Sequence, residues 1–487
     1  MGAEPEFETL GRGQLTLLDV IAQSIGFIGP VFASAFFIST IAGASFTGKG
    51  AGIAVPVSII LAGVGILGVA WIISRYARRI HAAGSLYDYV TESFGRQAGF
   101  LAGWVYYGGM SMLTLAIGFA FGGFLSSTLS DTLGWDIQWY WLAIAFWIVA
   151  FGMQYLGVQV STRAQLVLAL GSMLIISGFA VYIILKGGGS GNSVKPFSPG
   201  QSTASGIFYG VLYAVILFIG FESAANLAEE TADPRRNIPR AILISVIAAG
   251  VFYVTLAYAL LIVFGLDLAT FLKSFPQLAV AAGGGADPSI GSTRFGELVE
   301  WLIVIDIAAV GLGTATGTSR GLFALARDGR LPRQLAAVHP THKTPYIAAA
   351  TTAIASIAVI IIVHLTDGLV LNDPKTDPGE WFGFLQFGAA FGGFSLVIVY
   401  LAISLSGFLG QPGENRLLLA LAGAVGTISM CAAIYGVVKG APELWRLDRV
   451  WWISLIWIGL GVIALVVLQS RGAFAVRTAG ETRALHD

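Results

Sequence analysis

Charged residues are scarce in this 487-residue chain, since Asp, Glu, Lys and Arg make up only 11% of it. A soluble globular protein carries about 25%, and a single hydrophobic core stops growing beyond roughly 250–300 residues. The 56% of residues that are hydrophobic exceed what such a core buries, so we expect the surplus to face lipid. The 27 basic and 27 acidic residues leave no net charge, which argues against a nucleic-acid partner.

Cysteine and histidine are nearly absent. The single cysteine, Cys431, excludes an intrachain disulfide and a cysteine-based zinc site, and its apolar surroundings predict a small buried side chain. The five histidines are scattered over loops and ends and form no His-x-x-x-His helix face. With no converging nucleophiles, metal ligands or carboxylate pairs, we predict no enzyme activity, no cofactor and no metal. Nothing in the sequence indicates an obligate protein partner.

Long apolar runs are what the chain does contain. A bilayer core needs about 20 apolar residues per helix, and twelve runs meet this length: 17–43, 52–74, 98–127, 138–157, 164–185, 205–227, 239–265, 297–324, 346–364, 380–407, 416–438 and 450–469. The polar or Gly- and Pro-rich stretches 186–203, 276–296 and 366–380 are predicted loops. We therefore predict an all-α polytopic membrane protein of about 12 transmembrane helices, with the lipid bilayer as its surroundings.

Basic residues are unevenly divided between the two sides of these runs. With a cytoplasmic N-terminus, 18 Lys and Arg lie on the N-terminal side and 9 on the other. The positive-inside rule then predicts a cell-membrane protein with a cytoplasmic N-terminal tail at 1–16 and a cytoplasmic C-terminal tail at 470–487.

Two of the runs are interrupted. The first contains Gly26, Gly29 and Pro30, and the sixth places Gly220 beside Glu222. Non-helical backbone is tolerated at membrane depth only where it is buried in protein or lines a cavity. The two runs open two successive sets of five spans, so the second set enters with opposite topology. Paired breaks of this kind indicate a substrate site near the midplane.

Several motifs carry a family resemblance. The run GFESAANLAEETADPRRNIPRA at 220–241 resembles the sixth-span signature of the amino acid–polyamine–organocation (APC) superfamily. Residues 319–332, with His339 and 343–345, resemble the loop after its eighth span, and weaker matches lie at 84–89 and 157–159. The resemblance implies a leucine-transporter-type fold: a five-helix repeat at 17–185, an inverted repeat at 205–407, and two accessory helices at 416–469. It also implies a permease that takes up an amino acid or related amine by alternating access.

Local chemistry within the sixth-span signature gives further expectations. Asp233-Pro234 is expected to end a helix, with Pro239 starting the next. The arginines that follow, Arg235, Arg236 and Arg240, face the inner leaflet and could pair with Glu229 and Glu230.

An unwound half-helix start offers free N–H groups that favour an anion. The amides of Gly26, Phe27, Ile28 and Gly29 are candidates for a substrate carboxylate, and carbonyls near Gly220 are candidates for its ammonium. Phe221 could act as a hydrophobic gate, and Glu222 either binds a cationic group or braces the broken helix. Pro30 has no N–H where the family commonly has Gly-x-Gly, so amines and other organic solutes stay open beside α-amino acids. The expected substrate-binding set is Ser24, Ile25, Gly26, Phe27, Ile28, Gly29, Tyr106, Phe218, Ile219, Gly220, Phe221, Glu222 and Asp306, with Tyr107 and Phe391 as further specificity candidates.

Coupling to an ion is the remaining question. Asp306 lies inside the eighth span, where an acid is a functional candidate by default: it could bind an amine, carry a proton or pair within the bundle. Sodium-coupled relatives hold sodium with hydroxyls of this span and carbonyls of the first. Candidates here are Gln23, Asp306, Thr314, Thr316 and Thr318, unless the hydroxyls bond their own helix backbone. Many proton-coupled members carry a Lys in span five, where this chain has Ser172.

Sodium, a proton and exchange without a coupling ion therefore all remain open. A channel or receptor-like sensor is the other alternative, but neither a selectivity-filter ring nor a large soluble domain is recognisable.

Overall fold

The computed structural model describes residues 13, 15–43, 50–80, 86–189, 191–366, 380–441 and 444–470, without the side chains of 158–168, 229, 440, 444 and 445. Most of both predicted tails and of the loop at 366–380 lies outside these residues. The α-helices are α1 (Leu17–Ile28), α2 (Pro30–Gly43), α3 (Val55–Tyr76), α4 (Leu86–Phe94), α5 (Arg96–Leu133), α6 (Trp139–Leu156), α7 (Val158–Lys186), α8 (Ala204–Phe218), α9 (Pro234–Val263), α10 (Leu268–Lys273), α11 (Gln277–Ala282), α12 (Thr293–Arg327), α13 (Tyr346–Leu365), α14 (Glu380–Leu409), α15 (Arg416–Gly440) and α16 (Val450–Ser470). Short 3₁₀ helices are η1 (Gly52–Ala54), η2 (Lys195–Phe197), η3 (Pro199–Gln201), η4 (Phe221–Glu230), η5 (Arg333–Ala336) and η6 (Leu444–Arg449).

Twelve membrane-spanning helices were expected, and the described residues contain 12 helical segments long and apolar enough to cross a membrane. The first span consists of α1 and α2 together, and the sixth of α8 with most of η4. The all-helical prediction is therefore confirmed, while the division into two inverted repeats stays a prediction.

The first break follows from a single glycine. Thr16 and Asp19 form a capping box that starts α1. Gly29 then adopts the left-handed conformation at φ 56°, which ends the helix, and Pro30 opens α2 as its first residue. A Cβ at Gly29 would lie 1.8 Å from Val310 Cγ2, so glycine is required both for the backbone angle and for the contact with α12.

The second break is similar. Helix α8 ends at Phe218, Gly220 has φ 115°, and the chain continues as the 3₁₀ helix η4. A Cβ at Gly220 would lie 2.3 Å from Phe27 Cδ1, which shows how closely the two broken spans approach each other.

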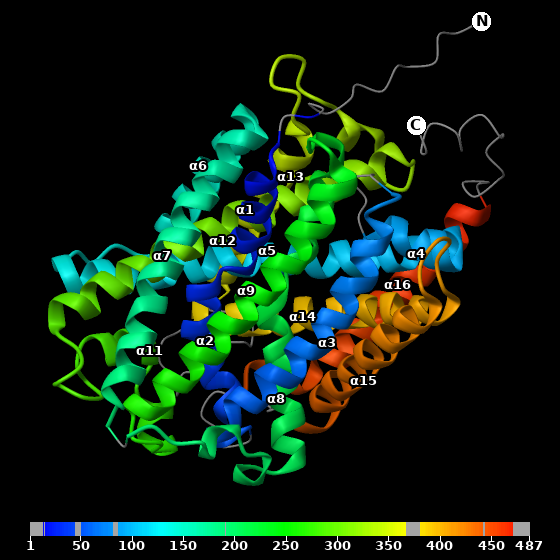
Figure 1. Cartoon of the computed structure of the whole chain (residues 1–487). Coiled ribbons are helices and arrows are strands. Elements are labelled where there is room, and N and C mark those ends of the chain that lie inside the picture. Colours follow the sequence, from blue (N-terminus) through cyan, green and yellow to red (C-terminus); the bar gives the residue numbers. More distant parts are fainter. Residues whose placement is uncertain are drawn as a thin grey trace, which may run out of the picture.

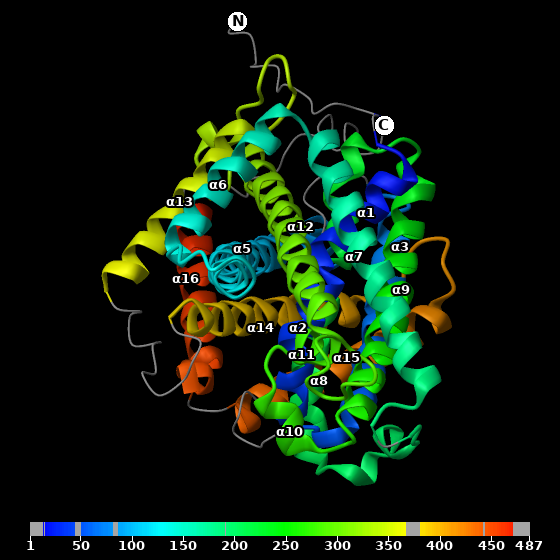
Figure 2. The same ribbon diagram turned by 90° about the vertical axis from the view of Figure 1, so that its left-hand side faces the viewer.

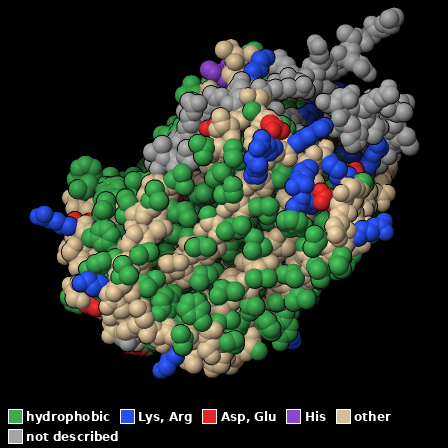
Figure 3. All heavy atoms as spheres, viewed as in Figure 1, with side chains coloured by type: hydrophobic (Ala, Val, Ile, Leu, Met, Phe, Trp, Pro, Cys, Tyr) green, Lys and Arg blue, Asp and Glu red, His purple; other side chains and the backbone are tan. Residues whose placement is uncertain are grey.

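The interrupted spans lie inside the bundle and the last two helices at its edge (Figure 1). The most apolar stretch of the first span is completely buried, whereas only a third or less of the corresponding stretches in α15 and α16 is buried. Figure 2 shows α14 running beside α5, which is seen nearly end-on. A broad hydrophobic surface with few charges covers one face of the molecule, as expected for contact with lipid (Figure 3). Cys431 is exposed on α15, so the expectation of a buried cysteine is wrong.

Some predicted loops contain helical turns. Residues 276–296 include α11 and the beginning of α12, and residues 186–203 include η2 and η3. Helix α9 begins at Pro234, so Pro239 lies inside it and does not start it. The reason is that Pro234 already occupies the first helical position, where a missing N–H is harmless.

Candidate functional site

Two hydrogen bonds join the breaks of the first and sixth spans. Ser24 Oγ donates to the Phe221 carbonyl at 2.9 Å, and Ser223 Oγ donates to the Gln23 carbonyl at 3.3 Å. All four residues are buried. The structure thus brings the two predicted breaks together, although they lie about two hundred residues apart in the chain.

The amides expected to bind a carboxylate are not free. Gly26, Phe27 and Ile28 belong to the regular helix α1, and Gly29 N donates to the Ile25 carbonyl at 3.0 Å. The break thus lies later than expected, since a glycine inside a helix does not by itself end it. The donors at the start of α2 belong instead to Val31 and Phe32.

Asp306 caps this half-helix start. Its Oδ2 accepts hydrogen bonds from Val31 N at 2.9 Å and from Phe32 N at 2.8 Å. Its Oδ1 accepts one from Ser172 Oγ at 3.2 Å. The carboxylate is fully buried, so Asp306 links α12, α2 and α7. Of the three roles considered for it, pairing within the bundle is present in the geometry.

Glu222 is held in a comparable way at the second break. Its Oε1 accepts a hydrogen bond from the Tyr106 hydroxyl at 3.1 Å, and its Oε2 accepts one from Gly220 N at 3.1 Å. The side chain is fully buried. These contacts fit the bracing role for Glu222. Tyr106 on α5 lies beside the second break, and its role in substrate binding stays a prediction.

The remaining predicted binding residues have different surroundings. Ile25 packs against Ala169 and Ala309, on α7 and α12. The Phe218 ring lies 5.6 Å from that of Tyr253 on α9. Phe221 packs instead against Tyr400 of α14, with ring centroids 5.6 Å apart. Phe221 is the first residue of η4 and so lies directly at the second break. Its role as a gate stays a prediction.

The polar side chains considered for a coupling cation mostly have protein partners. Gln23 Nε2 donates to the Gly313 carbonyl at 3.2 Å, and Thr314 Oγ1 donates to the Gly311 carbonyl at 3.2 Å. Thr318 shares a 2.9 Å hydrogen bond with Thr114 of α5. Thr316 is buried on the same helix. The backbones of α1 and α12 touch here, because a Cβ on Gly313 would lie 2.9 Å from Phe27 Cα.

Aromatic rings close the bundle on the α2 side of the breaks. Phe36 packs against Phe124, Phe275 and Phe382 with ring centroids 5.4–6.0 Å apart, and Phe275 lies 5.3 Å from Phe382. These rings come from α2, α5, the α10–α11 turn and α14. We call these four residues the aromatic plug.

A buried ion pair closes the α1 side. Arg320 Nε and Nη2 donate to the two Glu230 oxygens at 2.7 and 3.3 Å, and both side chains are at most 3% exposed. Leu15 N donates to the Glu230 carbonyl at 3.0 Å and Ala232 N to the Leu15 carbonyl at 2.8 Å, so the segment before α1 is bound to the end of η4. We call the pair Glu230–Arg320 the buried latch.

The latch corrects one expectation. Glu230 pairs with Arg320 of α12 and not with the arginines that follow Pro234, because α12 extends to Arg327 and carries Arg320 into the protein. The side chain of Glu229 lies outside the described part of the chain.

The sequence did not indicate Tyr400 or Thr114 as parts of the site. No local sequence signal marks either residue, because each is placed by a contact between spans that lie far apart in the chain. Of the specificity candidates, Tyr107 packs on Tyr106 at 4.9 Å between ring centroids, and Phe391 is buried on α14.

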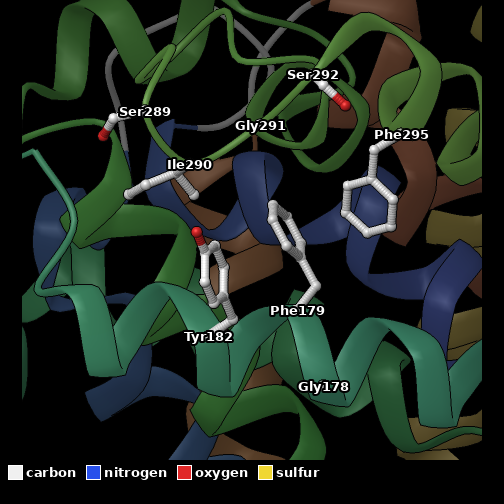
Figure 4. A pocket seen from close by; sticks show the side chains of 8 residues that line it. All are labelled: Gly178, Phe179, Tyr182, Ser289, Ile290, Gly291, Ser292 and Phe295. Atoms are coloured by element: carbon white, nitrogen blue, oxygen red, sulfur yellow. The ribbon is translucent and has the colours of Figure 1, made fainter.

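A separate pocket of about 470 Å³ lies between α7 and the turn before α12. Figure 4 shows Phe179 and Tyr182 of α7 facing Ile290 and Phe295 across it. It shares no residue with the breaks. In the described part of the chain, no group of three or more His, Cys, Asp or Glu could hold a metal ion.

Comparison with known proteins identifies the class. A family model described as amino acid permease matches residues 15–469. The chain is 28% identical over 367 residues to the branched-chain amino acid permease BcaP of Bacillus subtilis (strain 168), covering 70% of this chain and 71% of the relative. It is 27% identical to the low-affinity putrescine importer PlaP of Escherichia coli (strain K12) and 25% identical to the methylthioribose transporter of Bacillus subtilis (strain 168), each over 69% of this chain and 71% of the relative. The match over nearly the whole chain confirms the resemblance drawn from its motifs, and the protein belongs to the amino acid permease family of membrane transporters.

Proposed function

We propose that this permease takes up an amino acid or related amine by alternating access, with the substrate held between the breaks of the first and sixth spans. The observation that carries the proposal is the contact between the two breaks, made by Ser24 with Phe221 and by Ser223 with Gln23. The aromatic plug on one side and the buried latch on the other are the two closures that would open in turn.

The relatives support a small nitrogen-containing substrate. One is named a branched-chain amino acid permease and another a putrescine importer. Both of these solutes carry an ammonium group, which suits a site with two buried carboxylates, Asp306 and Glu222. The methylthioribose transporter shows that the relatives' range extends to a sugar-like solute.

A proton carried by Asp306 is our proposal for the coupling ion. Sodium would need several oxygen ligands that are free to surround it. In the described structure, the Gly313 and Gly311 carbonyls of α12 already accept hydrogen bonds from Gln23 Nε2 and Thr314 Oγ1. A buried carboxylate on a helix that contacts both the first and the fifth span can instead take up a proton as the bundle opens.

We further propose that the protein lies in the cell membrane with both termini in the cytoplasm. Lys and Arg gather toward the end of the molecule at which α1 begins (Figure 3). This distribution supports the proposal through the positive-inside rule. In the proposed orientation, the buried latch would lie on the cytoplasmic side.

Uptake into proteoliposomes tests the function. Purified protein should exchange a radiolabelled amino acid or amine across the bilayer, and a pH gradient should drive accumulation that a sodium gradient does not. Absence of counterflow with every amino acid and amine would overturn the transporter proposal. Accumulation driven by a sodium gradient alone would overturn the proposal that a proton is the coupling ion.

A further inference from the structure

The polarity of the two breaks bears on the chemistry of the substrate. A helix start carries partial positive charge and attracts anions, whereas a helix end carries partial negative charge and attracts cations. Two helix starts, α2 and η4, and two helix ends, α1 and α8, lie at the breaks. A substrate carboxylate would need donors of a helix start that have no other acceptor.

The start of α2 has no such donor. Pro30 lacks an N–H, Val31 N and Phe32 N both donate to Asp306 Oδ2, and Ala33 N donates to the Gly29 carbonyl at 2.8 Å. Whether charged or protonated, the Asp306 carboxyl group occupies the position that a substrate carboxylate would take.

At the start of η4, two of the amides have acceptors within the protein. Gly220 N donates to Glu222 Oε2, and Ser223 N donates to the Gly220 carbonyl at 2.9 Å. Asp306 from α12 thus takes up the amide donors at the start of α2, and Glu222 takes up the Gly220 amide at the second break. The ends of α1 and α8 favour a cation. Neither broken span contains a basic residue that could fill this role.

The charge balance points the same way. The stretches 17–43, 204–230 and 297–319 contain no Lys, Arg or His. Asp306 and Glu222 are nevertheless fully buried there. Gln23 Oε1 is a further buried acceptor without a hydrogen-bond donor among the described residues. Buried carboxylates need a positive partner or a proton, and none of these three stretches supplies a positive partner.

We propose that the substrate is an organic amine that carries no carboxylate. The proposal rests on the proposed transport function and narrows it, because it assigns the cationic group to the breaks and excludes zwitterionic α-amino acids. Asp306 is the residue that sets this selectivity, since it stands where the carboxylate of an amino acid would bind.

Pairs of compounds that differ only in a carboxylate test this selectivity. Suitable pairs are 1,4-diaminobutane with ornithine, agmatine with arginine, and 3-methylbutylamine with leucine. Binding to the purified full-length protein is measured by thermal shift, and transport by counterflow in proteoliposomes. In at least one pair the amine should bind at least tenfold more tightly than its amino acid and should be the member that is exchanged.

An Asp306→Ala variant frees the Val31 and Phe32 amides. In that pair, it should reduce the ratio of the affinity for the amine to the affinity for the amino acid at least tenfold. The control Glu92→Gln changes an exposed acid on α4 and should leave the preference unchanged. An unchanged affinity ratio in Asp306→Ala would overturn the proposal that Asp306 sets the selectivity. If the variant does not fold, the affinity ratio measured in the unmodified protein still tests the substrate class.

The outcomes separate the two proposals. Exchange of amino acids with equal or greater affinity than their amines would leave the transporter standing and overturn the substrate class. Absence of binding and exchange for both members of every pair would overturn both.

Discussion

Loss of one partner of the buried latch should shift the protein toward a state open on the α1 side. Arg320→Met removes the guanidinium and keeps an apolar stem of similar length. It leaves the Glu230 carboxylate buried without its partner, where the pair now makes two hydrogen bonds at 2.7 and 3.3 Å. Removing one member of a buried pair costs about 3–5 kcal/mol. We propose that the pair breaks when the α1 side opens; even the lower value then shifts the equilibrium by roughly two orders of magnitude.

Thiol labelling can measure this shift. In a Cys431→Ser background, which removes the exposed native cysteine, a Ser24→Cys variant places a thiol at a position that is fully buried in the closed state. Its reaction rate with a small thiol reagent should rise about a hundredfold when Arg320→Met is added. The control is Arg79→Met, whose pair with Glu92 is 3.9 Å long and partly exposed. An exposed pair contributes at most about 1 kcal/mol, so labelling should change by less than about fivefold.

The double variant Glu230→Met with Arg320→Met provides the decisive comparison. Replacing both members of a buried ion pair by apolar side chains is often close to neutral, so labelling should return toward the rate of the background protein. A rate that is unchanged in Arg320→Met, or equally high in the double variant, would refute the view that the pair holds the α1 side closed.

Three further predictions concern the breaks. Asp306→Asn should abolish uphill uptake driven by a pH gradient, and full retention of uphill uptake would exclude Asp306 as the proton carrier. Gly29→Ala should abolish transport and lower the free energy of unfolding by about 1–3 kcal/mol through overpacking against Val310. The control Gly152→Ala has no atom within 4 Å of the added Cβ and should change neither transport nor the free energy of unfolding. Equal loss of thermal stability in the two variants would contradict the packing argument. Tyr106→Phe removes a hydrogen bond to the buried Glu222 and should cost about 1.5–3 kcal/mol in denaturant unfolding, whereas Tyr435→Phe on the exposed face of α15 should be neutral; similar losses in both would argue against the bracing role.

The presence of a break in the first and sixth spans could be predicted from local sequence, but the residue at which the first break begins and the partners of both breaks could not. Gly29 and Gly220 can be recognised as candidate break points, because a left-handed backbone angle or a close approach requires glycine. The partner of Val31 and Phe32 is Asp306, 274–275 residues further along, and the partner of Gln23 is Gly313, 290 residues away. Periodicity and turn residues carry no information on such contacts, which depend on how the spans pack.

The helices themselves were easier to predict than their ends. Lipid requires long apolar runs, so length and hydrophobicity sufficed for all twelve spans. Arg320 lies within the predicted span 297–324 and also within the stretch 319–332 that resembles a loop, so the sequence left its surroundings open. Its burial depends on Glu230, whose carboxylate satisfies it from another helix.

The backbone contact between Phe27 and Gly313 has a mechanical consequence. No side chain separates α1 from α12 at this point, so α1 can turn about it as a lever turns about a fulcrum. Leu17 lies ten residues before Phe27, which makes the arm about 15 Å long at 1.5 Å per residue. A rotation of about 20° at the fulcrum would therefore carry the beginning of α1 through roughly 5 Å. A small adjustment beside the substrate would in this way be magnified at the far end of the arm, where Leu15 is bound to the end of η4.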